Sequence, residues 1–210
     1  MAGSSGADAV NVGSSLVLAS ASPARAAMLR SAGVVFAVDA AAVDETRVKS
    51  ALRTDGADAV RAAEALAELK AKQVSERYRD ALVIGADQVL ECAGAWFDKP
   101  ADRAAARRDL LALRAKMHMQ VSAACVVRDG AVLWRHSARA RLAMRDFSDD
   151  FLDGYLAAAG DAVLGCAGAY QLEGLGAQLF THVDGDYFAV LGLPLLPLLD
   201  FLREHGAVPR

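Results

Sequence analysis

Residues 81–86 form the continuous apolar run Ala-Leu-Val-Ile-Gly-Ala, which limits the choice of fold more than any other segment. A strand that is apolar on both faces is typical of a sheet covered by helices on both sides, because half-exposed strands alternate apolar and polar residues. The run therefore predicts an α/β protein. It is followed by Asp87 and Gln88, and ligands of α/β proteins gather at the ends of such strands.

A second apolar run, residues 15–19, leads directly into Ser20-Ala-Ser22-Pro23-Ala-Arg25. Ser22 suits a helix N-cap, and Pro23 suits the first helical position. The unpaired amides and the dipole of such a helix favour a phosphate group, and Arg25 can lean back toward it. The junction predicts either an anion site that includes Ser20, Ser22 and Arg25 or an ordinary capped turn.

Composition limits the kinds of partner that the chain can have. With 210 residues, of which 54% are hydrophobic, the chain can bury the core of one domain. A net charge of −3 provides no basic surface for a nucleic-acid polymer, so any phosphate must bind in a local pocket. We expect a flexible leader over residues 1–14, which are small and polar, and a single domain over residues 15–210.

The sequence also lacks the usual signs of secretion and of membrane insertion. Residues 1–14 have neither the basic start nor the apolar core of a signal peptide. The apolar run at 191–199 is interrupted by glycine and proline and is well short of the roughly 20 residues that cross a bilayer. The three cysteines are widely separated and form no CxxC motif, which argues against a disulfide framework. We therefore expect a cytoplasmic protein with no membrane partner.

The rest of the chain alternates helical and strand-like patterns. Helices are expected over residues 58–78, from Pro100 to about Arg114, and over 148–159 and 195–204. Strands are expected over residues 34–38, 120–128 and 131–142. Asp129-Gly130 is a strong hairpin signal between the last two strands. Since a hairpin pairs its strands antiparallel, the sheet is expected to be mixed.

Charged residues accompany several of these elements. Asp44 and Glu45 follow a strand-like segment, and in an extended chain only one of the two can face a given cleft. Lys70 lies in line with apolar residues of its helix, either as a site residue or as a lysine whose ammonium reaches out to water. Asp87 is a candidate metal ligand or general base, or else ends its strand in an Asx turn. Lys99, at the expected helix entrance beside Pro100, is a second candidate cationic anchor.

Taken together, the order and spacing of these motifs resemble the Maf family of nucleoside triphosphate pyrophosphatases. The resemblance covers nearly the whole chain after Ser15. It rests on Ser20-Ala-Ser22-Pro23 with Arg25, Val43-Asp44-Glu45, Lys70-Ala71, Asp87, Lys99-Pro100, Gly168-Ala-Tyr170 with Glu173-Gly174, and Gly192-Leu-Pro194. The family implies a mixed α/β fold related to inosine triphosphate pyrophosphatases, with two lobes around a long cleft. It also implies a divalent metal cofactor, Mg²⁺ or Mn²⁺, and its members are frequently homodimers.

The resemblance further implies a reaction in which water attacks the α-phosphorus of a nucleoside triphosphate and pyrophosphate leaves. A divalent metal would cancel phosphate charge that otherwise repels the nucleophile. The roles implied are metal binding by Glu45 and Asp87, base catalysis by Asp87, phosphate binding by Arg25, Lys70 and Lys99, and hydrogen-bond donation to phosphate by Ser20 and Ser22.

Two segments resemble the branch of the family that hydrolyses 7-methyl-GTP. They are Asp87-Gln88-Val89 and Leu172-Glu173-Gly174, where the pyrimidine branch usually has Asp-Thr-Val and Ile-Gln-Gly. A carboxylate at Glu173 can accept from guanine N1–H and N2–H₂ and favours the positive charge of a methylated ring. Gln88 and Glu173 are thus expected to bind substrate, unless Glu173 is a surface acid that caps a turn.

The chain also departs from the family pattern. The family commonly has two arginines after the proline, whereas here Ala24 and Ala26 flank a single Arg25. Two alternatives stay open beside the 7-methyl-GTP pyrophosphatase, and the missing arginines leave room for the second. One is a pyrophosphatase for UTP, dTTP or modified pyrimidine nucleotides, and the other is a non-catalytic, nucleotide-sensing regulator of cell division.

Overall fold

The computed structural model describes residues 16–210, so the leader expected over residues 1–14 lies outside the described residues. Its strands build one sheet in the order β2-β1-β3-β5-β6-β7, with β4 paired to β3. The strands are β1 (Leu16–Leu18), β2 (Ala37–Val38), β3 (Leu82–Cys92), β4 (Ala95–Phe97), β5 (Met117–Arg128), β6 (Ala131–Met144) and β7 (Phe180–Asp184). The β1 strand is parallel to β2 and β3, and the other pairs are antiparallel, which confirms the mixed sheet.

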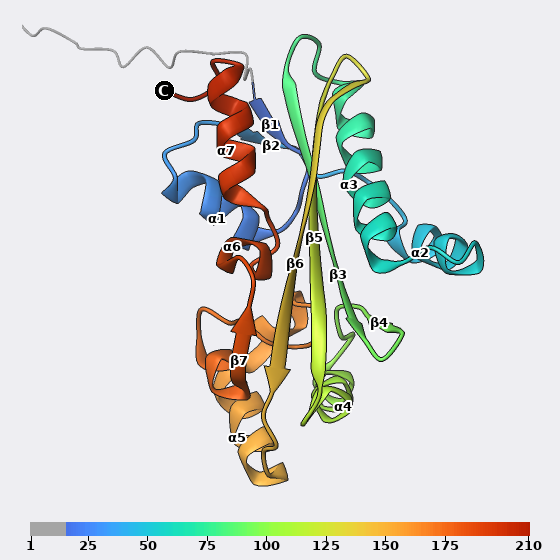
Figure 1. Ribbon diagram of the computed structural model, residues 1–210, viewed down its shortest axis with the longest axis vertical. Coiled ribbons are helices and arrows are strands. Elements are labelled where there is room, and N and C mark those ends of the chain that lie inside the picture. Colours follow the sequence, from blue (N-terminus) through green and yellow to red (C-terminus); the bar gives the residue numbers. More distant parts are fainter. Residues whose placement is uncertain (1–15) are drawn as a thin grey trace, which may run out of the picture.

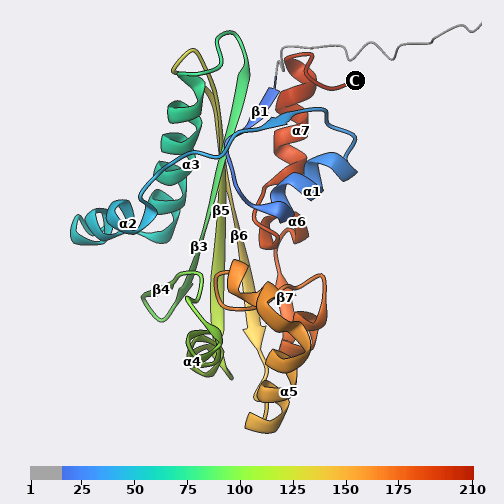
Figure 2. The same cartoon turned by 180° about the vertical axis from the view of Figure 1, so that it is seen from behind.

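Helices flank this sheet on both faces, as Figures 1 and 2 show. They are α1 (Pro23–Ser31), α2 (Glu45–Thr54), α3 (Ala59–Ser75), α4 (Arg103–Leu113), α5 (Asp149–Ala159), α6 (Tyr187–Val190) and α7 (Leu195–Glu204), with 3₁₀ turns η1 (Gly160–Gly165) and η2 (Leu175–Leu179). Leu82 and Ile84 of β3 pack in the cluster that contains α1 and α7, whereas Val83 packs in the cluster that contains α3. The apolar run of β3 is therefore buried on both faces, as its sequence predicts.

Gly85 lets α3 lie unusually close to β3. A Cβ at this position would stand 2.1 Å from the backbone oxygen of Ala67 and 2.7 Å from the amide nitrogen of Ala71. Alanines on the facing side of α3 complete this close contact, since Ala67 and Ala71 are both fully buried. The close approach sets the depth at which Lys70 of α3 meets Asp87 of β3.

The structure corrects several expected boundaries. Asp87 does not end a strand, because β3 runs on to Cys92 and pairs with β5 over that length. The α4 helix begins at Arg103 with Asp102 as its N-cap, so Pro100 does not start it and Lys99 lies in the preceding loop. In the expected strand over residues 34–38, only Ala37 and Val38 pair with a neighbour.

The expected cap of α1 and the expected hairpin are confirmed. Ser22 caps α1 and Pro23 opens it. The hairpin through Asp129-Gly130 joins β5 and β6, both longer than expected. All three cysteines are free. Among residues 16–210, no helix has both the length and the apolar character needed to cross a membrane.

Candidate active site

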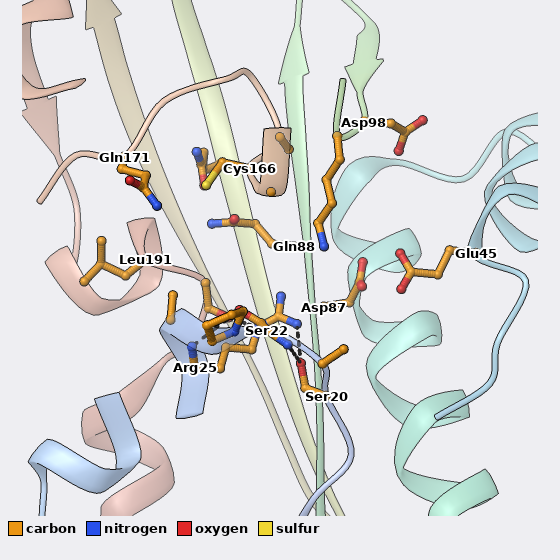
Figure 3. Close-up of a pocket in the computed structure, with 18 of the residues that line it drawn as sticks. Ser20, Ser22, Arg25, Glu45, Asp87, Gln88, Asp98, Cys166, Gln171 and Leu191 are labelled. Atoms are coloured by element: carbon orange, nitrogen blue, oxygen red, sulfur yellow. Dashed lines mark hydrogen bonds between the residues drawn. The ribbon is translucent and has the colours of Figure 1, made fainter. Parts of the chain in front are cut away.

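A pocket of about 670 Å³ opens where β1 ends beside the longer β3. The last residue of β1, Leu18, pairs with Ile84, and β3 continues beyond this point without β1 beside it. Asp87 and Gln88 point to opposite faces of β3. Both nevertheless line the pocket, because β1 has ended at this point and the spaces on the two faces of β3 connect around its open edge. The far wall comes from residues 162–173 and 190–192, so the pocket lies between two parts of the molecule, consistent with a cleft between two lobes (Figure 3).

Lys70 is held between two carboxylates. Its Nζ lies 2.6 Å from Glu45 Oε1 and 2.6 Å from Asp87 Oδ1, and its side chain is only 8% exposed. The three residues come from α3, α2 and β3. The alternative in which the Lys70 ammonium reaches out to water is therefore wrong. The group carries one positive and two negative charges, so it favours a further cation.

Glu45 reaches the pocket from a helix rather than from the extended segment that its sequence suggests. Asp44 caps α2 by accepting from the amide of Arg47, and Glu45 is the first helical residue. Only Glu45 of the two acids lines the pocket, as expected, although the cause is the start of a helix. Burial would raise the pKa of Glu45, but the charge and hydrogen bond of Lys70, helped by Lys49 and Lys99, lower it overall.

Asp87 has one carboxylate oxygen without a partner. Oδ1 accepts from Lys70, whereas Oδ2 is buried and has no hydrogen-bond partner in the structure. Buried polar atoms of this kind are normally paired, because desolvation without a partner costs about 1–3 kcal/mol. Oδ2 is therefore available to a cation or to a water molecule, and Asp87 itself is 3% exposed.

Arg25 connects three parts of the chain at the edge of the pocket. Its Nη1 donates to Ala86 O at 2.9 Å and to Ser20 Oγ at 3.0 Å, and its Nε donates to Gly192 O at 2.7 Å. Nη2 makes none of these bonds and remains as a donor. Burial lowers the pKa of Arg25, an effect that Asp87 and Glu45 oppose. Gly192 has φ +105°, a backbone conformation that favours glycine, and it approaches the guanidinium closely.

The remaining predicted residues also line this pocket. The hydroxyl oxygens of Ser20 and Ser22 accept from the amides of Ser22 and Arg25, which leaves their O–H groups free to donate elsewhere. Gln88 is tied to α6, since its Nε2 donates to Val190 O at 2.9 Å. Lys99 and Glu173 are exposed at the rim. The structure thus brings all nine residues predicted from the sequence to one pocket, while their individual roles stay predictions.

Comparison with known proteins assigns the family. Residues 15–205 match the family model described as Maf-like protein. The chain belongs to the Maf family. It is 60% identical over 190 residues to the nucleoside triphosphate pyrophosphatase of Paramagnetospirillum magneticum, covering 90% of this chain and 98% of that protein. It is 48% identical over 193 residues to the 7-methyl-GTP pyrophosphatase of Rhizobium meliloti, covering 92% and 97% of the two chains. The mixed α/β fold is consistent with this family.

Several pocket residues of this Maf protein escaped the sequence analysis. Lys49 and Asp98 form an ion pair of 2.6 Å at the pocket, and Gln120, Cys166 and Gln171 contribute to its wall. Lys49 follows Glu45 by four residues, so recognising α2 as a helix would have placed both on one face. The extended interpretation of Glu45 concealed this relation.

His118, the second residue of β5, does not line the pocket of the Maf protein. It is 2% exposed, and its Nε2 lies 2.8 Å from the hydroxyl of Tyr170. Burial lowers the pKa of His118 to about 4, so the imidazole is neutral at pH 7. Its place in the core supports a packing role.

Proposed function

We propose that this Maf protein hydrolyses a nucleoside triphosphate, most specifically 7-methyl-GTP, to the monophosphate and pyrophosphate. The observation that carries the proposal is the buried Lys70 between Glu45 and Asp87, in one pocket with Arg25 and Lys99. Positive groups from three parts of the chain can bind a triphosphate, and two carboxylates among them are not needed for anion binding alone. The names of the relatives support the same reaction.

The carboxylates also fit a divalent cation. Mg²⁺ is commonly held by one or two carboxylates together with substrate phosphates, and Asp87 Oδ2 lacks a partner. Among residues 16–210, no group of three or more His, Cys, Asp or Glu could hold a metal by itself, so phosphate or water oxygens would complete the coordination. Glu45 and Asp87 would hold the ion, which when bound would neutralise charge on the phosphates.

The protein's own groups supply the remaining chemistry. The Asp87 carboxylate orients the attacking water and takes its proton as general base. Lys70 holds both carboxylates in place, and Arg25 Nη2 and Lys99 stabilise negative charge on the phosphates. The hydroxyls of Ser20 and Ser22 donate to phosphate oxygens. A water held by Asp87 would attack the α-phosphorus, and pyrophosphate would leave.

The reaction is tested by measuring pyrophosphate release. The nucleotides are 7-methyl-GTP, GTP, UTP, CTP and dTTP, each with Mg²⁺ and with excess chelator. We expect the highest kcat/KM for 7-methyl-GTP. Release is expected to be lost in chelator, because without the metal the two carboxylates repel the phosphates. Preference for UTP or dTTP would support the alternative function, a pyrophosphatase for pyrimidine nucleotides. Metal-dependent nucleotide binding without pyrophosphate release would identify a sensor.

Glu173 is the residue proposed to select the base. Glu173→Gln removes the negative charge but keeps the size, so we expect the ratio of kcat/KM for 7-methyl-GTP to that for UTP to fall by about tenfold, the value of one charged hydrogen bond. Glu204→Gln, an exposed acid at the end of α7, is the matched control and leaves the ratio unchanged. An unchanged ratio in Glu173→Gln would remove the basis for the choice of base.

We further propose a cytoplasmic protein that forms a homodimer. The free state of all three cysteines supports a reducing environment. The homodimer is supported by the family resemblance and is tested by light scattering of the purified chain.

A further inference from the structure

The α2 helix is bound to the rest of the molecule in an unusual way. Its one buried residue is Lys49, at 8% exposure. Leu52 is half-buried and packs against the core beneath α3. Lysine is among the residues that are least often buried unless they are paired. Charged contacts, rather than an apolar stripe, therefore determine where most of α2 lies.

Three residues of α2 make these contacts from one face. Glu45, Lys49 and Arg53 are spaced by four residues, so they lie one above the other along the helix. Glu45 pairs with Lys70, and Lys49 Nζ lies 2.6 Å from Asp98 Oδ1. The Arg53 guanidinium lies 4.7 Å from the centre of the Trp96 ring and donates to Trp96 O at 3.3 Å. This face therefore joins α2 to α3 at one end and to the segment 96–98 at the other.

We propose that Lys49 and Asp98 are a positioning pair for the pocket, fixing the helix that carries Glu45 against the loop that carries Lys99. This inference rests on the proposed function, in which Glu45 binds metal and Lys99 binds phosphate. Lys49 stands one helical turn after Glu45, and Asp98 immediately precedes Lys99 in the chain. One ion pair of 2.6 Å thereby sets the separation of two groups that the substrate must reach together.

Burial gives this pair its strength. The Lys49 side chain is only 10% exposed, so the ammonium pays a desolvation cost that a partner must offset, and removing one partner of a buried pair is strongly destabilising. Asp98 is 55% exposed, so its substitution disturbs little of the core. We therefore expect loss of the Asp98 charge to shift α2 while the global fold persists.

The test uses charge reversal in the full chain. Lys49→Asp and Asp98→Lys each place like charges together, and the combined variant restores an ion pair of the same total length. We expect each single variant to lose about 10- to 100-fold in kcat for 7-methyl-GTP with Mg²⁺, the scale of small misplacements at a reacting centre, and the combined variant to regain most of it. The matched control is the exposed Arg107–Asp153 pair between α4 and α5, where the same reversals leave kcat unchanged.

Hydrogen exchange of the free protein provides a readout that needs no substrate. Amides of residues 45–54 are expected to exchange faster in each single variant and to regain protection in the combined variant, while β3 and β5 keep theirs. If Lys49→Asp does not fold, Asp98→Asn replaces it, and the same gain in exchange and loss of kcat are expected. The positioning role of the pair is overturned if the wild-type chain is active and its single variants keep full kcat. It is also overturned if the combined variant regains neither kcat nor protection. A wild-type chain that releases no pyrophosphate refutes the proposed function instead, while the exchange experiment still tests the contact.

Discussion

Asp87→Asn is expected to reduce pyrophosphate release by about 10²- to 10⁴-fold, the usual contribution of a general base. Asparagine keeps the shape of the side chain, but it removes the charge that faces Lys70 and cannot take a proton from water. Lys70 retains Glu45 at 2.6 Å, so its ammonium stays paired and the fold is expected to persist. The measurement is kcat for 7-methyl-GTP with Mg²⁺, together with circular dichroism of the variant.

Asp153→Asn is the control for the Asp87 substitution. Asp153 is an exposed acid that also pairs with a cation, Arg107, but it lies away from the pocket on α5. Its substitution is expected to leave kcat unchanged. Turnover of Asp87→Asn near the wild-type rate would exclude Asp87 as the base.

Gly85→Ala is expected to destabilise the protein by about 3 kcal/mol, at the upper end of the usual cost of overpacking. The added methyl group would overlap the backbone of α3 at Ala67 and Ala71, and a helix backbone cannot give way as a flexible side chain can. The helix must move as a unit and takes Lys70 with it, so activity is expected to fall as well. Denaturant unfolding measures the first effect and pyrophosphate release the second.

Gly154→Ala is the matched substitution for Gly85. Gly154 lies inside α5, and a Cβ there would meet nothing within 4 Å. Alanine is the better helix former by about 1 kcal/mol, so this variant is expected to be more stable than the wild type. Equal stability of the two variants would show that the close contact at Gly85 carries no constraint.

Much of the fold could be predicted because strong local signals coincide with tertiary structure. The run before Asp87 is apolar because both of its faces are buried in the core. Asp129-Gly130 favours a hairpin through its own backbone preferences. Boundaries that depend on neighbours were wrong. Residues 34–36 have strand-forming side chains but no pairing partner, and Pro100 is displaced from the start of α4 by the better cap, Asp102.

The candidate site could likewise be predicted only in part. Each predicted residue reaches the pocket, although Lys70 and Asp87 lie inside α3 and β3 and not at the ends of these elements. What the sequence could not indicate was the set of partners. Asp98 is 49 residues from Lys49, and Gly192 is 167 residues from Arg25, so only the folded chain shows these contacts. The end of β1 beside a longer β3, which creates the pocket, is likewise a property of strand lengths.

Arg25 takes over a backbone role where β1 stops. The amide of Ala19 still donates to Ile84 O, and the next carbonyl on that side, Ala86 O, receives its hydrogen bond from the guanidinium instead of from a strand. A side chain thus extends the hydrogen bonding of the sheet edge and at the same time lines the pocket in which we propose that phosphate binds. The bonds to Gly192 O and Ala86 O come from two different nitrogens of the guanidinium, whereas the donors of a lysine ammonium all lie on one atom. The contact at the sheet edge and the proposed contact with phosphate therefore depend on the same arginine.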